Sequence, residues 1–292
     1  MKEKLAVWAA VLTLAVPASG QDVVRATGVH VTESLSYAAG IAQDREWDRV
    51  WVGFTVPRTE YGGMYYGGNL NSDRRTLEDV LDPPTVEQAA RRALLRASGE
   101  ETETTAVAVL LQLEEGSLRD ARIRSMGAPA GLGGQPLVWL GEADPLDSLP
   151  WLMALLDDSR GELREDLVSA IGLHELPDTV VPFLFELAHS DPDEEVRERA
   201  RFWMADAVAS RMGLMRGSAE ERDSDDARVQ RSAVYALVNS DEAGAPARLE
   251  RLIESGTSKE VKRHAVLNLA YLDDGRGLPA LEVLARRAGL LK

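Results

Sequence analysis

Apolar residues recur every four positions in four segments of the second half of the chain. The segments read LREDLVSAI, VRERARFWM, VQRSAVYAL and VKRHAVLNL, and they begin at the marker residues Leu163, Val196, Val229 and Val261. Four positions after the markers stand Leu167, Ala200, Ala233 and Ala265, and eight positions after them stand Ile171, Met204, Leu237 and Leu269. An apolar row at i, i+4 and i+8 follows one face of a helix. Each segment therefore predicts a helix that buries its marker face.

The four predicted helices repeat with a nearly constant period. The markers are 33, 33 and 32 residues apart, and prolines at 150, 182, 246 and 279 are separated by 32, 64 and 33. Proline is favoured in the first turn of a helix, so each of these prolines predicts the start of a further helix. Asp193, Asp226 and Ser258 precede their markers by three residues and are candidate caps. The repeating unit is therefore a pair of helices.

The period skips one proline, close to Leu214. The segment RMGLMRGSAEERDSDD contains Gly213 and Gly217 there, and it places Glu220 and Glu221 where apolar residues are expected. We expect the first helix of this third unit to be short or broken.

The first half of the chain has a different pattern. Residues 49–57 alternate between apolar and polar and predict a strand, 105–126 predict a hairpin that turns at Glu115-Gly116, and 135–140 predict another strand. Residues 85–98 predict an amphipathic helix, whereas 21–45 give no clear signal. The pattern predicts a small α+β module over 21–145, joined through 141–148 to helical repeats over 146–292.

The repeat region resembles HEAT repeats and the HEAT-like repeats of phycobilin lyases. The likeness rests on the proline at the start of the first helix and on DPDEEVRERA at the start of the second. It implies an α-α superhelix that mediates protein–protein contacts. The whole chain is more loosely similar to exported bacterial HEAT-repeat proteins, through LVWL at 137–140. Two departures are the degenerate third unit and Gln230, where the family has arginine. The expected fold is mostly α: a HEAT-like solenoid preceded by the α+β module.

Residues 1–20 have the pattern of a secretory signal peptide. MKEK is basic, residues 5–16 form an apolar run, and Ala18 and Gly20 are the small residues before a cleavage site at Gln21. The apolar run is shorter than the roughly 20 residues that span a bilayer. We expect a periplasmic or secreted protein without an integral membrane segment after cleavage.

Charge and cysteine content narrow the class of partner. Removal of residues 1–20 leaves 272 residues and changes the net charge from −15 to −16. An acidic chain is unsuited to nucleic acid, whose phosphates require a basic surface. The absence of cysteine excludes thiol catalysis and thiolate metal sites. We therefore expect a protein or peptide partner, and no cofactor.

Residues that could carry chemistry are scattered. The four histidines are His30, His174, His189 and His264, and none has a partner at metal-ligand spacing. We interpret His174 and His189 as capping or solvated side chains at helix ends, and His264 as a surface residue. The glycine-rich stretch 61–68 lacks phosphate-loop spacing, and the acidic stretch 220–226 lacks EF-hand spacing. The sequence thus predicts no catalytic residue and no metal site, and we expect a protein that is not an enzyme.

A candidate contact surface lies on the second helix of each pair. Six positions after the markers stand Ser169, Phe202, Tyr235 and Leu267, and two positions after them stand Glu165, Glu198, Arg231 and Arg263. At 100° per residue both positions lie opposite the core. Aromatic and arginine side chains are typical of interface hot spots. Phe202, Tyr235 and Leu267, flanked by Arg231 and Arg263, are therefore the predicted partner-binding residues on the concave face. The alternative is that this row is buried in the fold.

One position after the markers stand Arg164, Arg197, Gln230 and Lys262. The family likeness implies that these side chains bond carboxylates and carbonyls of the adjacent turn, and the alternative is a basic groove for an acidic peptide. Two alternatives to a concave binding face stay open for the whole chain. One is a small-ligand binder or enzyme with its site in the N-terminal module, near Tyr65 and Tyr66. The other is self-assembly through the C-terminal end, ARRAGLLK.

Overall fold

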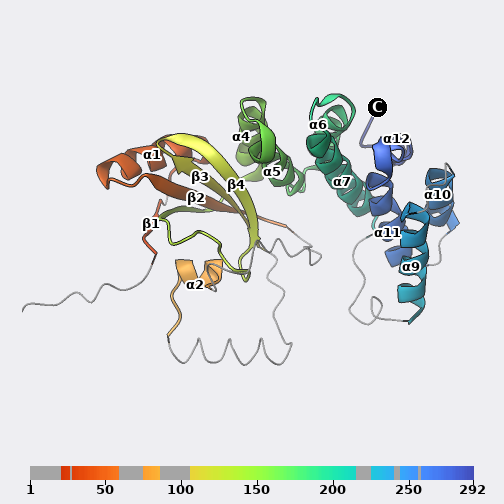
Figure 1. Cartoon of the computed structure of the whole chain (residues 1–292), viewed down its shortest axis with the longest axis horizontal. Coiled ribbons are helices and arrows are strands. Elements are labelled where there is room, and N and C mark those ends of the chain that lie inside the picture. The colour runs from red at the N-terminus through yellow and green to blue at the C-terminus, as the bar shows by residue number, and fades with distance from the viewer. Residues whose placement is uncertain are drawn as a thin grey trace, which may run out of the picture.

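The computed structural model describes residues 21–26, 28–58, 75–85, 106–214, 225–239, 244–255 and 258–292. A five-stranded mixed sheet with the order β1-β5-β2-β3-β4 lies at one end, and a row of helices extends from one side of it (Figure 1). The strands are β1 (Val23–Arg25), β2 (Arg49–Val56), β3 (Val107–Glu114), β4 (Ser117–Ser125) and β5 (Leu137–Glu142). Strand β5 is parallel to both β1 and β2, whereas β3 is antiparallel to β2 and β4.

The predicted strands and hairpin are confirmed. The hairpin turns at Glu115 and Gly116, whose φ angles of 51° and 76° are the left-handed values that a two-residue turn requires. Residues 50, 52, 54 and 56 of β2 are buried on one face, as the alternation predicts. Trp51 is buried as well, because β2 is a central strand that is covered on both faces.

Helices cover both faces of the sheet. One face packs on α1 (Ser34–Asp44), α4 (Pro145–Asp157) and α5 (Gly161–Gly172), and this core continues into the other helices. The opposite face packs on the short α2 (Leu77–Leu81) and the segment around Leu132, with Trp51 and Trp139 between them. The segment 141–148 was predicted to join two modules. It comprises the last two residues of β5 and the start of α4, which is capped by Asp144.

The remaining helices follow in pairs. They are α6 (Pro177–Ser190), α7 (Glu194–Arg211), α9 (Asp225–Asn239), α10 (Ala245–Ser255), α11 (Lys259–Ala270) and α12 (Leu278–Arg287). Asp193 and Ser258 cap α7 and α11 as predicted, because their side chains accept hydrogen bonds from the first-turn amides of Glu195 and Val261. Asp226 lies inside α9, so its prediction as a cap is wrong.

The proline marker predicts helix starts correctly in only part of the array. Pro246 and Pro279 occupy the first turns of α10 and α12. Pro150 and Pro182 lie inside α4 and α6, which begin five residues earlier at Pro145 and Pro177. The reason is that each of these two helices contains a second proline, and the earlier one occupies the first turn.

Helices α5 and α7 pack side by side in the predicted manner. Glu165 near the start of α5 approaches Arg199 of α7 at 3.7 Å. At the end of α5, Gly172 allows the Trp203 ring to approach so closely that a Cβ built there would lie 2.3 Å from the ring. The contact that is nearer the start of α5 is also nearer the start of α7. The two helices are therefore parallel, as stacked repeats require.

Helices α7 and α11 pack in the opposite direction. The Phe202 and Tyr271 rings are 5.8 Å apart, whereas Asp206, one turn later in α7, binds Arg263 at 3.1 Å, two turns earlier in α11. Helix α11 also packs against α9, in parallel, through Arg231–Glu260 and Tyr235–His264. Helix α11 therefore lies between α7 and α9.

The fold-class prediction of a mostly α chain built on a HEAT-like superhelix is wrong. The chain is a mixed sheet with helices packed around it, and sheet and helices share one continuous core. The helix pairs also do not follow each other in chain order: α9 and α10 lie farthest from the sheet, and the C-terminus returns to the vicinity of α6 and α12 (Figure 1). After α7 the chain continues at the far end of the array with α9 and α10, and it comes back toward α7 with α11 and α12.

Candidate functional site

The predicted contact row does not form one exposed surface. Phe202 is only 8% exposed, since it packs against Trp203 and Tyr271. Leu267 is half-buried against the core, and Ser169, at the same position of α5, is buried. Only Tyr235 is well exposed, at 53%. The alternative left open for this row, burial in the fold, therefore holds for all of it except Tyr235.

The two predicted arginines serve internal contacts. Arg263 and Arg58, which follows β2, both bind the Asp206 carboxylate of α7, at 3.1 and 2.5 Å. All three side chains are at least four-fifths buried, so this ion triad joins the sheet to α7 and α11. Arg231 of α9 lies 4.0 Å from Glu260 of α11, beyond hydrogen-bonding distance, and keeps donors for other partners.

An exposed surface forms around two tyrosines, of which the sequence predicts only Tyr235. Tyr235 of α9 and Tyr271 at the end of α11 are 53% and 58% exposed. Partial burial raises the pKa of Tyr271, the Arg199 guanidinium opposes this rise, and Tyr235 adds to it, so Arg199 and Tyr235 both lie within electrostatic range of the Tyr271 hydroxyl. Phe202 lies beneath Tyr271, and His264 beside Tyr235. We call Tyr235, Tyr271, Arg199, Phe202 and His264 the tyrosine surface.

Tyr271 was outside the predicted row because it follows the last turn of its helix. The marker pattern covers only nine residues, 261–269 in this helix, and Tyr271 stands ten positions after Val261. The antiparallel packing of α7 and α11 then brings it over Phe202. No periodic signal in the sequence indicates that packing.

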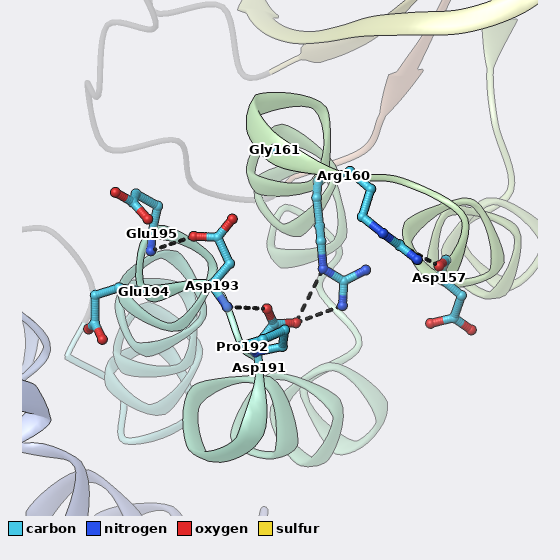
Figure 2. A pocket seen from close by; sticks show the side chains of 9 residues that line it. Asp157, Arg160, Gly161, Asp191, Pro192, Asp193, Glu194 and Glu195 are labelled. Carbon is cyan, nitrogen blue, oxygen red and sulfur yellow. Dashed lines mark hydrogen bonds and ion pairs between the residues drawn. The ribbon is translucent and has the colours of Figure 1, made fainter.

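Two of the residues that stand one position after the markers, Arg164 and Arg197, make internal contacts. The Arg164 guanidinium binds the buried Asp191 carboxylate of the next turn at 2.6 Å and the Leu156 carbonyl. Arg197 donates to the Asp191 carbonyl. A cavity of about 740 Å³ opens beside this ion pair (Figure 2), and its walls carry more carboxylates than cations: Asp157, Asp191, Asp193, Glu194 and Glu195. Arg164 and Arg197 are thus committed to internal contacts in acidic surroundings, so these two positions do not form a basic groove.

A second groove lies between β4 and α5. It has a volume of about 450 Å³ and is lined by residues 119–124 of β4 and by Glu162, Leu163, Asp166 and Ser169 of α5. Burial raises the pKa of Asp166 to about 6; Arg199 opposes the rise, and Asp120, Glu162 and Glu165 add to it. Within the described parts of the chain, no hydrogen bond or ion pair engages the Asp166 carboxylate. The sequence gives no sign of this groove, since its walls are some 40 residues apart.

The histidines have structural roles. His174 is buried between α4 and α5, where Nδ1 donates to the Ala170 carbonyl and Nε2 accepts from the Ser148 hydroxyl. It therefore caps a helix end, which is one of the two roles predicted for it, and burial lowers its pKa to about 4. His189 is exposed and bonds the Phe185 carbonyl, as predicted. His264 is half-buried beside Glu260. Among the described residues, no group of three histidine or acidic side chains could hold a metal ion.

Several predictions fall outside the described residues. These are the signal peptide at 1–20, the stretch 61–68 with Tyr65 and Tyr66, the helix at 85–98 beyond Thr85, and most of the acidic stretch 220–226. Gln230 also has no described side chain. Of the helices that the structure does describe, none combines the length and apolarity needed to cross a bilayer.

Comparison of the chain with protein-family models, with curated proteins and with solved structures finds no match. The functional argument therefore rests on the surfaces themselves.

Proposed function

We propose that the chain is an exported, non-catalytic protein that binds another protein through the tyrosine surface. The observation that carries this proposal is the joint exposure of Tyr235 and Tyr271. Both are more than half exposed, and they come from two neighbouring helical segments, Tyr235 from α9 and Tyr271 from the end of α11. Tyrosine supplies a large, rigid contact area with little loss of conformational entropy, and it is enriched in binding hot spots.

The cations around the tyrosines indicate what the partner presents. Arg199 lies 3.7 Å from Glu165, and Arg231 lies 4.0 Å from Glu260, so neither guanidinium is fully hydrogen-bonded by these acids. A guanidinium carries five donors and pairs well with carboxylates and carbonyls. The partner that fits is a protein segment with an apolar side chain for the tyrosine rings and acceptor oxygens for the arginines.

The experiment compares three forms of the chain from residue 21 to 292, each immobilised and exposed to the exported proteins of its source cell. The forms are the wild type, the Tyr235→Ala/Tyr271→Ala double variant, and Tyr37→Ala. Tyr37 is the matched control, because it is a 40% exposed tyrosine on α1, away from the tyrosine surface. Hot-spot truncations cost about 2 kcal/mol each, so the double variant should bind its partner at least about 30-fold more weakly.

The control variant should retain the partner fully, and all three forms should give the same circular dichroism spectrum. The proposal is wrong if the double variant retains the same proteins as the wild type with unchanged affinity. Its export is tested separately: N-terminal sequencing of the protein from the cell envelope should begin at Gln21.

A small-ligand binder or an enzyme stays the alternative, and one observation favours it. A half-buried carboxylate with a raised pKa in a cleft is typical of acid–base sites, and Asp166 fits that description. Turnover of a small ester, glycoside or peptide substrate by the wild type, lost in Asp166→Asn, would establish the alternative. The same screen without turnover would count against the alternative.

A further inference from the structure

One face of α9 is open to solvent, although its sequence pattern is that of a buried face. Val229 is 70% exposed, and Ser232, Ala233 and Ala236 on the same side of the helix are exposed as well. We call these four residues the α9 face. Val229 and Ala233 belong to the apolar row that α5, α7 and α11 bury, and Leu237, the next residue of that row, has no described side chain. What covers the corresponding face of α7 and α11 indicates what fits here.

In α7 the corresponding face is covered by two helices. Helix α5 lies along one side, where Gly172 takes in the Trp203 ring. Helix α6 lies along the other side and is antiparallel, because Asp178 at its start binds Arg211 at the end of α7 at 2.8 Å. The residues of α7 at the four positions are Val196, Arg199, Ala200 and Trp203. All of them except the arginine are at most 1% exposed.

The same arrangement recurs in α11 and in α5. In α11, α9 covers one side of the face through Tyr235, whose ring lies 6.3 Å from the His264 ring, and α10 packs against the same helix. In α5, strand β4 and helix α4 are the two neighbours, and the Leu156 carbonyl of α4 accepts a hydrogen bond from Arg164. Among the second helices that the structure describes, only α9 leaves this face exposed.

The sequence accounts for the missing neighbours of α9. Each described first helix buries a leucine two or three residues after its proline marker, and these leucines are 0% exposed: Leu152, Leu184, Leu249 and Leu281. The third unit has Arg216 and Gly217 at these positions, so its pattern supplies no large apolar side chain for α9. The other expected neighbour, α7, is separated from α9 by α11. The pattern of the chain therefore predicts no internal helix on the α9 face.

The α9 face fits a helix that carries large apolar side chains. Its residues recur at intervals of three and four, as the ridges and grooves of packed helices do. Three of the four are serine or alanine, so another helix can approach closely, and dense packing then requires large residues opposite the small ones. A second copy of α9 would set small residues against small ones and leave the contact underpacked. Helices α6 and α10, which pack on α7 and α11, carry buried leucines instead.

We propose that the α9 face binds an amphipathic helix of a partner protein. The partner helix presents leucine, methionine or phenylalanine at intervals of three and four residues, and it continues on α9 the series of contacts that joins α9 to α11. Tyr235 lies about 120° around α9 from Val229, at about 100° per residue, so the α9 face borders the tyrosine surface but is a different side of the helix. The proposal therefore does not rest on the tyrosine surface.

The test is a selection of peptides that bind the full chain from residue 21 to 292. The library holds random linear peptides of about 16 residues, long enough for about four turns of helix. The selected peptides should share a row of large apolar residues at i, i+3 or i+4, and i+7. Ala233→Arg should weaken their binding about tenfold or more, because the longer side chain keeps the two helices apart. Ala154→Arg, which changes an exposed alanine inside α4, is the matched control and should leave binding unchanged.

A second variant and a spectroscopic measurement identify the contact. Val229→Ser removes the apolar side chain without adding bulk, and it should weaken the selected peptides about fivefold or more. Because Val229 and Ala233 are exposed, both variants should unfold at the wild-type temperature. The helical circular dichroism of a selected peptide mixed with the chain should exceed the sum of the separate spectra, because a short peptide becomes helical only when it binds.

The remaining outcomes also decide the proposal. It is wrong if no peptide is selected, if the selected peptides gain no helix, or if they bind either α9 variant as tightly as the wild type. A wild type that sediments as a dimer, and that Ala233→Arg makes monomeric, would assign the α9 face to a second copy of the chain. Peptides that are lost on Tyr235→Ala/Tyr271→Ala but retained on Ala233→Arg belong to the tyrosine surface. They would support the first proposal and overturn this one.

Discussion

Helices α5 and α7 run in the same direction where they meet, whereas α7 and α11 run in opposite directions. All three helices have the same apolar row at intervals of four residues, and each buries most of it. The row therefore determines which face of a helix is buried, but not which helix covers it or in which direction. Direction depends on contacts between distant segments, such as Asp206 with Arg58 and Arg263.

The exposed row of α9 shows the consequence. Val229 and Ala233 occupy marker positions that the pattern assigns to the core, yet Val229 is 70% exposed and Ala233 is exposed. Helix α7 would cover this row if the pairs were stacked in chain order. Because α11 takes the place beside α7, α9 lies at the far end of the array.

The largest loss of stability is expected from breaking the contact between the antiparallel helices α7 and α11. Asp206→Ala leaves Arg58 and Arg263 buried without their shared carboxylate, and loss of one partner from a buried ion pair costs about 3 to 5 kcal/mol. Urea unfolding should show this loss. Hydrogen exchange should increase first in α11, which the triad joins to α7, and later in β2 and β3.

A matched control removes an exposed ion pair from the same region. Glu254→Ala breaks the contact with Arg287, in which both side chains are more than half exposed, and should cost less than about 1 kcal/mol. An Asp206→Ala variant as stable as this control would show that the triad does not hold the two sets of helices together.

The contact between the parallel helices α5 and α7 should have the next largest effect on stability. Gly172→Ala places a methyl group about 2.3 Å from the Trp203 ring, and overpacking of this kind costs about 1 to 3 kcal/mol. Gly40 is the matched glycine, because it lies in α1 and a Cβ there meets nothing within 4 Å. Gly40→Ala should stabilise the chain by about 0.5 to 1 kcal/mol through its helix propensity. Thermal unfolding of both variants should give shifts of opposite sign.

The sequence predicts the local structure well where a short-range pattern specifies it. Alternation over 49–57 indicates β2, Glu115-Gly116 indicates the hairpin turn, and Asp193 and Ser258 mark helix starts. It misses β1, which is three residues long, and α1, whose buried row consists of Ser34, Ala38 and Ala42. Such small side chains give almost no periodic hydrophobic signal.

The candidate sites are less predictable than the elements, for the same reason. Tyr235 was identified from its register, but Phe202, Leu267 and Arg263 were assigned to a surface that the reversed packing of α11 buries or occupies. The groove between β4 and α5 needs both the sheet order and the position of α5. Neither follows from spacing along the chain, since the two walls meet only in the folded protein.

The smallest effect on stability is expected at α5. One face of this helix packs on α7, and the other is turned to β4. The second face carries Asp166, whose pKa is raised from 3.8 to about 6 because burial disfavours its charged form. The folded state thus binds the proton more tightly than the unfolded state, so stability decreases as the pH rises from about 4 to about 6. Asp166→Asn removes this dependence. The variant should melt at a higher temperature than the wild type at pH 7.5, and the difference should shrink as the pH falls to 4.

The groups that face Asp166 limit how this result is interpreted. Arg199 favours the charged form of Asp166, whereas Asp120, Glu162 and Glu165 oppose it, so the pKa of Asp166 depends on all four neighbours. The comparison is made between pH 4 and 7.5, with Glu186→Gln as the exposed control that should follow the wild type. A more stable Asp166→Asn would show that the fold keeps a carboxylate there against its own stability, as is common at functional sites. An unchanged melting temperature would show that the carboxylate is solvated and that the groove is more open to water than the structure shows.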